Sequence, residues 1–130
     1  MSRSGYSDDC ENLGLWRGAV QRATTGYRGQ HLLRKLLAAL DAMPVKRLIA
    51  DEIQNESGDV CALGALDPAV KEYDAVYLAE HFGIAHALAA EIVYMNDEAF
   101  VWREDAETPE QRWVRMRAWV ASQIVPETIS

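Results

Sequence analysis

The feature that most constrains this chain is a stripe of leucines between residues 28 and 43. Leucines recur there at the spacing of one helix face, and Pro44 then prevents the helix from continuing. The stripe consists of Leu32, Leu33, Leu36, Leu37 and Leu40. It predicts an amphipathic helix from about Arg28 to Met43 at the centre of the core, with Leu36 and Leu37 both strongly buried.

Three more helices are predicted from helical spacing of apolar residues and from end signals. The first begins after Asp8 or Asp9 and runs to about Thr24. Two shorter helices are expected over 75–82 and 84–95, on either side of Gly83. Residues 1–7 are polar and are predicted to form a flexible arm ahead of the first helix.

The last helix has the clearest start signal in the chain. Thr108 is a suitable N-cap, Pro109 suits the first helical position, and Gln111 completes a capping box. Pro126 is expected to end this helix. The pattern as a whole predicts a mostly α fold: a single compact domain over residues 1–130, with about five helices and at most one small β-hairpin.

The segment 45–66 fits two structures. Its apolar residues at 45, 48, 49 and 53 fit a helix. The runs 48–53 and 59–63 also flank the turn-like residues 55–58 and fit a β-hairpin. The hairpin is favoured because the second run is short and follows Gly58, and it must then pack on the helices.

Length and composition are those of one globular domain. The chain has 130 residues, of which 49% are hydrophobic and 25% charged. It shows no apolar run of signal-peptide or transmembrane type, so a cytoplasmic location and no membrane partner are expected. Only Cys10 and Cys61 occur, and nothing in the sequence requires them to form a disulfide.

Charge is unevenly distributed along the chain. The formal net charge is −7. Residues 1–47 contain eight Lys and Arg against four Asp and Glu, whereas residues 48–111 contain two against fifteen. Residues 112–130 contain three basic residues against one acid. An acidic balance disfavours broad binding to duplex DNA and favours a basic protein partner.

The densest acidic run lies between residues 96 and 110, and it also contains aromatic residues. Acids can form the rim of a protein interface while an aromatic side chain anchors its centre. The hypothesis is that this run binds a basic partner protein, although such runs are more often only a solvated face. Its proposed contact residues are Asp97, Glu98, Trp102, Glu104, Asp105 and Glu107.

The alternative is a nucleic-acid-binding regulator that uses the basic N-terminal helices. Tyr27 and His31 lie among these cations, a combination that suits a single strand or an RNA backbone. The cations concerned are Arg17, Arg22, Arg28, Arg34 and Lys35. Residues 78–92 also have helix-turn-helix spacing, but the second helix has no Arg, Lys, Asn or Gln over residues 85–91 to read base edges. An αα-hairpin that packs in the core is therefore favoured for this pair.

An enzyme is the least favoured function. Cys61 with His81 or His86 would be a nucleophile and base, but no third orienting group is evident and a buried, inert cysteine is expected. His81, His86 and Glu91 do not share a helix face, so no metal site is predicted. No catalytic residue and no cofactor are assigned.

Several sequence blocks resemble small uncharacterised proteins encoded by phages and prophages of proteobacteria. These blocks are Met1–Asp9, Trp16–Val20, Arg28–Gln30, Cys61–Ala65, Phe82–Leu88, Asn96–Glu98 and Arg112–Val120. The resemblance implies an accessory protein of a mobile element and assigns no functional residue. With the small size and the acidity, it makes an inhibitor of a host defence complex, of the anti-CRISPR kind, the favoured function.

Overall fold

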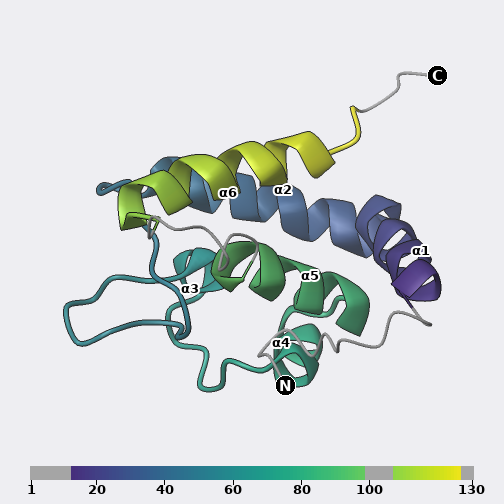
Figure 1. Ribbon diagram of the computed structural model, residues 1–130, viewed down its shortest axis with the longest axis horizontal. Coiled ribbons are helices and arrows are strands. Elements are labelled where there is room, and N and C mark those ends of the chain that lie inside the picture. The colour runs from purple at the N-terminus through teal and green to yellow at the C-terminus, as the bar shows by residue number, and fades with distance from the viewer. Residues whose placement is uncertain (1–12, 99–106, 127–130) are drawn as a thin grey trace.

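The computed structural model describes residues 13–98 and 107–126 (Figure 1). These ranges contain six helices, α1 (Leu13–Thr25), α2 (Tyr27–Ala42), α3 (Ala62–Leu66), α4 (Ala75–Phe82), α5 (His86–Asp97) and α6 (Pro109–Gln123). The prediction of a mostly helical, single compact domain is confirmed, with α3 as an additional short helix. The predicted arm 1–7 and the predicted start of the first helix lie outside the described residues.

The leucine stripe of α2 faces the core, and α2 lies alongside α6 (Figure 1). Leu33, Leu36 and Leu40 have no exposed surface. The indole Nε1 of Trp113 on α6 donates a 3.1 Å hydrogen bond to the Leu40 carbonyl, which joins the two helices. Leu37 is only partly buried, so the prediction that it lies as deep as Leu36 is wrong. It follows Leu36 by about 100° around the helix and falls at the edge of the stripe.

Helix α5 is the most enclosed element. Leu88, Ile92 and Val93 have no exposed surface, and α1, α3, α4 and α6 all contact this helix. Gly83 ends α4 with a φ of +68°, a left-handed conformation that suits glycine. α5 then begins at His86, two residues later than predicted.

Neither α4 nor α5 alone meets the requirements for a membrane span. In the part of the chain that the structure describes, no single helix is long and apolar enough to cross a membrane. α4 and α5 together have a suitable length and composition, but they are bent by 118° at the break between them.

Residues 45–61 form a hairpin-shaped loop, and no strand is formed within the described ranges. One isolated antiparallel bridge pairs Gln54 with Val60. The side-chain Oδ1 of Asn55 accepts hydrogen bonds from the backbone N–H groups of Ser57 and Asp59, which holds the turn. The predicted turn is therefore present, while the pairing on either side of it is too short to count as a β-hairpin.

Helix α3 begins where the second strand of that hairpin was predicted to continue. Its N-cap is Cys61, whose Sγ accepts a 3.4 Å hydrogen bond from the N–H of Gly64. The N–H of Ala62 donates at 3.1 Å to Oδ1 of Asn96 on α5. The first-turn N–H groups of α3 are thus satisfied partly by a residue far along the sequence, which favours a helix over the predicted strand.

Helix α6 begins as its sequence predicts. Oγ1 of Thr108 accepts from the N–H of Gln111 at 3.1 Å, and Oε1 of Gln111 accepts from the N–H of Thr108 at 2.9 Å. The capping box is therefore complete. The helix ends at Gln123, before Pro126.

Candidate functional site

The acidic end of α5, predicted as part of a partner-binding surface, is largely tied into the protein. Oδ1 of Asp97 accepts hydrogen bonds from the Tyr73 hydroxyl at 2.9 Å and from Nδ2 of Asn96 at 2.6 Å. The backbone N–H of Asp51 also donates to this carboxylate. The other oxygen, Oδ2, is buried and has no hydrogen-bond partner among the described residues. Asp97 is therefore an internal carboxylate, stabilised mainly at one of its two oxygens.

Burial dominates the electrostatics of this cluster. It raises the pKa of Asp97, and the hydrogen bonds from Asn96, Tyr73 and the backbone of Asp51 offset only part of that effect. The pKa of Tyr73 is also raised, first by burial and then by the neighbouring Cys61 and Asp97. Both side chains therefore favour their neutral forms more strongly than they would in water.

Cys61 is the buried cysteine that the sequence predicts. It has no exposed surface, and burial raises the pKa of its thiol to about 11. Nε2 of His81 lies 2.8 Å from Oδ2 of Asp67, and His86 packs edge-on against the ring of Trp16, with centroids 5.7 Å apart. Both histidines are thus engaged elsewhere, and neither contacts Cys61 as a base. Across residues 13–98 and 107–126, no three His, Cys, Asp or Glu side chains are grouped to hold a metal ion.

Glu107, predicted as an exposed partner-binding charge, is instead internal. Its side chain is 9% exposed, with Oε2 at 2.6 Å from Nε of Arg115 and Oε1 at 3.3 Å from Nε of Arg112. Both arginines also donate to the carbonyl of Asn96 at the end of α5. Glu107 therefore neutralises two arginines that join α6 to α5, and the prediction of exposure is wrong for this residue.

Of the remaining residues of the predicted acidic surface, the structure describes only Glu98. Glu98 is partly buried, and its Oε2 is enclosed without a hydrogen-bond partner in the described part of the chain. Three predicted contact residues lie outside the described residues: Trp102, Glu104 and Asp105. The described part of the run thus offers little exposed acidic surface.

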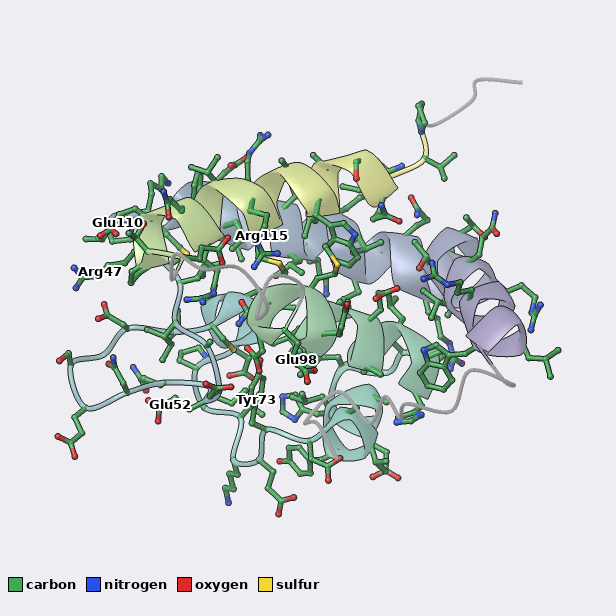
Figure 2. The ribbon with its side chains drawn as sticks, viewed as in Figure 1. Arg47, Glu52, Tyr73, Glu98, Glu110 and Arg115 are labelled. Atoms are coloured by element: carbon green, nitrogen blue, oxygen red, sulfur yellow. The ribbon has the colours of Figure 1, made fainter. Side chains whose placement is uncertain are left out.

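Two acidic residues, Asp51 and Glu52, line a hollow of about 370 Å³, here called the acidic hollow. Its lining residues are Asp51, Glu52, Ile53, Gln54, Pro68, Val70, Lys71 and Tyr73. Glu52 is exposed. Glu56 and Glu72 are also exposed and lie near the lining segments in sequence, although they are not part of the lining. None of these three forms an ion pair with another described residue. Figure 2 shows Glu52 and Tyr73 on the same side of the molecule, across α5 from α6.

The backbone at the edge of the acidic hollow is unusual. Asp51 has a φ of +72°, a left-handed conformation that residues with a side chain rarely adopt. Its backbone N–H donates to Asp97, which connects this edge to the buried cluster. Strained conformations of this kind occur often at binding sites. This surface was not predicted from the sequence, although the excess of acids over residues 48–111 was a signal for it.

The structure separates the cations that were predicted to bind nucleic acid. Arg17 and Arg22 are exposed on α1, whereas Arg34 donates a 2.7 Å hydrogen bond to a backbone carbonyl near the C-terminus. Arg28 and Lys35 lie together along a second hollow, of about 430 Å³. Of the five cations predicted to bind nucleic acid, only Arg28 and Lys35 therefore line the same hollow.

The packing αα-hairpin favoured for residues 78–92 is present, and its surroundings argue against a helix-turn-helix role. α4 and α5 do form an αα-hairpin with Gly83 at the turn. However, the would-be recognition helix α5 is enclosed by α1, α3, α4 and α6, so it cannot enter a DNA groove. The pair is part of the core.

No relative assigns a function to these features. Comparisons with protein-family models, with curated proteins and with solved structures gave no match to this chain.

Proposed function

We propose that this protein acts by binding a partner protein with a basic surface, and that the acidic hollow is the contact site. The observation that supports this most directly is the state of Glu52, Glu56 and Glu72. They are exposed and form no ion pair with another described residue, whereas Glu107 is neutralised within the fold. Exposed charges of one sign attract an oppositely charged partner and raise its rate of association.

The lining of the acidic hollow suits an arginine or lysine side chain from a partner. The carboxylate of Glu52 and the amide oxygen of Gln54 are acceptors for a guanidinium or an ammonium group. Ile53 and Val70, both 7% exposed, give the hollow apolar walls for the methylene stem. Lys71 is the one cation in this lining, and its exposed, flexible side chain can turn away from an incoming charge.

The resemblance to phage-encoded proteins supports a protein of the bacterial host as the partner. A host defence complex that binds nucleic acid carries a basic surface, because it must neutralise phosphates. An acidic protein can occupy such a surface and block it. Inhibition of a defence complex in the host cytoplasm, in the manner of an anti-CRISPR protein, is therefore the activity that we propose to test first.

The test compares two charge-reversed proteins with the wild type as baits in host lysate. The first carries Glu52→Lys, in the lining of the acidic hollow, and Glu72→Lys, between the lining residues Lys71 and Tyr73. The matched control carries Glu80→Lys and Glu110→Lys, two exposed acids that neither belong to the lining nor adjoin it in sequence. Both variants have the same net charge, so non-specific attraction is equal, and thermal unfolding checks that each is folded.

We expect a basic protein to be captured by the wild type and by the control, and to be lost with the variant at the acidic hollow. The purified protein should then bind the wild type in a salt-sensitive manner, with an association rate reduced about tenfold or more by the reversal at the acidic hollow. If both variants lose it equally, or if neither does, the acidic hollow is not the contact site.

A further inference from the structure

A second hollow lies between α2 and α4 and is independent of the proposed partner site. It has a volume of about 430 Å³, within the range of small-molecule sites. We call it the α2–α4 groove. It is lined by Tyr27, Arg28, His31, Leu32, Lys35, Leu66, Asp67, His81, Phe82 and Gly83.

One wall of the α2–α4 groove is a row of nitrogen donors. Arg28, His31 and Lys35 follow one another at intervals of three and four residues, so their side chains leave the same face of α2. All three are exposed, and none forms an ion pair with another residue in the described ranges. At 1.5 Å of rise per residue the row spans about 10 Å, enough for two neighbouring phosphate groups.

An aromatic ring stands at the start of this row. Tyr27 is 86% exposed, and its ring lies nearly parallel to that of His31, with an interplanar angle of 6° and centroids 6.2 Å apart. An exposed flat ring next to cations can stack on a nucleobase while the cations hold its phosphates. This combination of groups separates the α2–α4 groove from an ordinary basic surface.

The opposite wall carries an oriented acceptor. Oδ2 of Asp67 lies 2.8 Å from Nε2 of His81, and Oδ1 accepts from the N–H of Ala69 at 3.0 Å. The hydrogen bond to His81 is the main cause that lowers the pKa of Asp67, so this carboxylate is ionised at neutral pH. The wall is open beside Gly83, where a Cβ would meet no atom within 4 Å. An ionised carboxylate can accept from the amino group of a base or from a ribose hydroxyl.

We propose that the α2–α4 groove binds a nucleoside with two adjacent phosphate groups, the base against Tyr27 and the phosphates along Arg28, His31 and Lys35. The same chemistry occurs in the tail of a free nucleoside triphosphate and along a single nucleic-acid strand. Duplex DNA is disfavoured, because its stacked bases cannot reach Tyr27 and the net charge of −7 opposes a broad phosphate surface.

The test measures the affinity of three probes: a nucleoside triphosphate, an oligothymidylate of about ten nucleotides, and inorganic tripolyphosphate. The groove variant is Arg28→Glu with Lys35→Glu. Its matched control is Arg17→Glu with Arg22→Glu, which reverses two exposed cations on α1 and gives the same net charge. Tyr27→Ala removes the stacking surface alone.

In the groove variant, we expect the affinity for the nucleotide or the oligonucleotide to fall by about tenfold or more. In the control variant, the same affinity should fall by about twofold at most. Tyr27→Ala should weaken the base-containing probes and leave tripolyphosphate unchanged. If the strand is the ligand, the logarithm of its affinity should fall with the logarithm of salt with a slope of about −1.4, the value for two phosphate contacts.

Two results would overturn the proposal. One is the absence of binding of both base-containing probes to the wild type at millimolar concentration. The other is an equal loss in the groove variant and in the control, which would indicate only general attraction to surface cations. Neither result bears on the acidic hollow, whose residues are untouched by these variants.

Discussion

The hydroxyl of Tyr73 donates a 2.9 Å hydrogen bond to Oδ1 of Asp97, linking the loop before α4 to the last turn of α5. Both partners have raised pKa values, and burial is the first cause in each case. Tyr73 also lines the acidic hollow. The ionisation of Asp97 is therefore coupled to the residue that separates the acidic hollow from the core.

The stability of the protein should depend on the charge of Asp97. Burial raises its folded-state pKa above the ordinary value of 3.8, so between these two pKa values the folded state holds a proton that the unfolded state has lost. This contribution to stability is therefore lost as pH rises through the folded-state pKa. Asp97→Asn carries no charge to desolvate and keeps an acceptor for Tyr73. Urea unfolding should show it to be more stable than the wild type near pH 7, with the gain vanishing toward about pH 4.

Asp41 provides the control, because its pKa is shifted in the opposite direction to that of Asp97. Its hydrogen bond with Arg117 lowers the pKa of Asp41, so ionisation of this carboxylate favours the folded state. Asp41→Asn should therefore lose stability near neutral pH, and the loss should shrink in acid. A pH-independent effect of Asp97→Asn would show that the charge of Asp97 does not determine the stability of this region.

Glu107→Ala should destabilise the fold strongly. The substitution leaves Arg112 and Arg115, whose side chains are 15% and 16% exposed, without their carboxylate. Removing one partner of a buried ion pair costs about 3–5 kcal/mol in the free energy of unfolding. We expect a loss of about 3 kcal/mol, the lower end of this range, because both arginines keep a backbone carbonyl as acceptor. Chemical denaturation against Glu110→Ala, an exposed acid on the same helix, gives the comparison. Equal small losses in both variants would mean that Glu107 contributes only as a surface charge.

Two adjacent leucines of α2 should differ in their contribution to stability. Leu36 has no exposed surface, so Leu36→Ala should cost about 3 kcal/mol or more in the free energy of unfolding. Leu37 is partly buried at the edge of the core, and Leu37→Ala should cost about 1–2 kcal/mol. The measurement is the denaturation midpoint of each variant. Similar midpoints for Leu36→Ala and Leu37→Ala would contradict the deeper burial of Leu36.

Cys61 should react slowly with thiol reagents in the native protein. Its thiol is buried, and the pKa of about 11 leaves little thiolate at neutral pH. In a Cys10→Ser background, a thiol reagent should label Cys61 only as fast as the native structure opens around it. Labelling should become fast only when denaturant unfolds the protein. Rapid labelling under native conditions would contradict the burial of this thiol.

The elements that sequence predicts well here are those determined by neighbours along the chain. The capping box of α6 involves only Thr108 and Gln111, and the leucines of α2 repeat within one helix. Helix α3 was missed because the N–H of Ala62 is satisfied by Asn96, 34 residues away. No local pattern distinguishes that helix from a strand.

The two candidate sites were predictable to different degrees. The row at 28, 31 and 35 follows from helical spacing, although Arg34 was wrongly grouped with it because charge alone does not show a helix face. The internal position of Glu107 depends on how α6 meets α5, which spacing does not contain. The acidic hollow combines residues from the segments 51–54 and 68–73, which only the folded chain places together.

Asn96 connects three separate elements of the fold and should therefore affect how the molecule unfolds. Its side chain accepts from the N–H of Ala62 and donates to the carbonyl of Ile49, while its own carbonyl accepts from Arg112 and Arg115. The hairpin-shaped loop, α3 and α6 thus depend on one residue at the end of α5. Separation of any one of them leaves buried polar groups without partners in the others, so they should unfold as one cooperative unit. The loop that carries residues 51–54 of the acidic hollow is thereby attached to the core helix α5 through the carbonyl of Ile49.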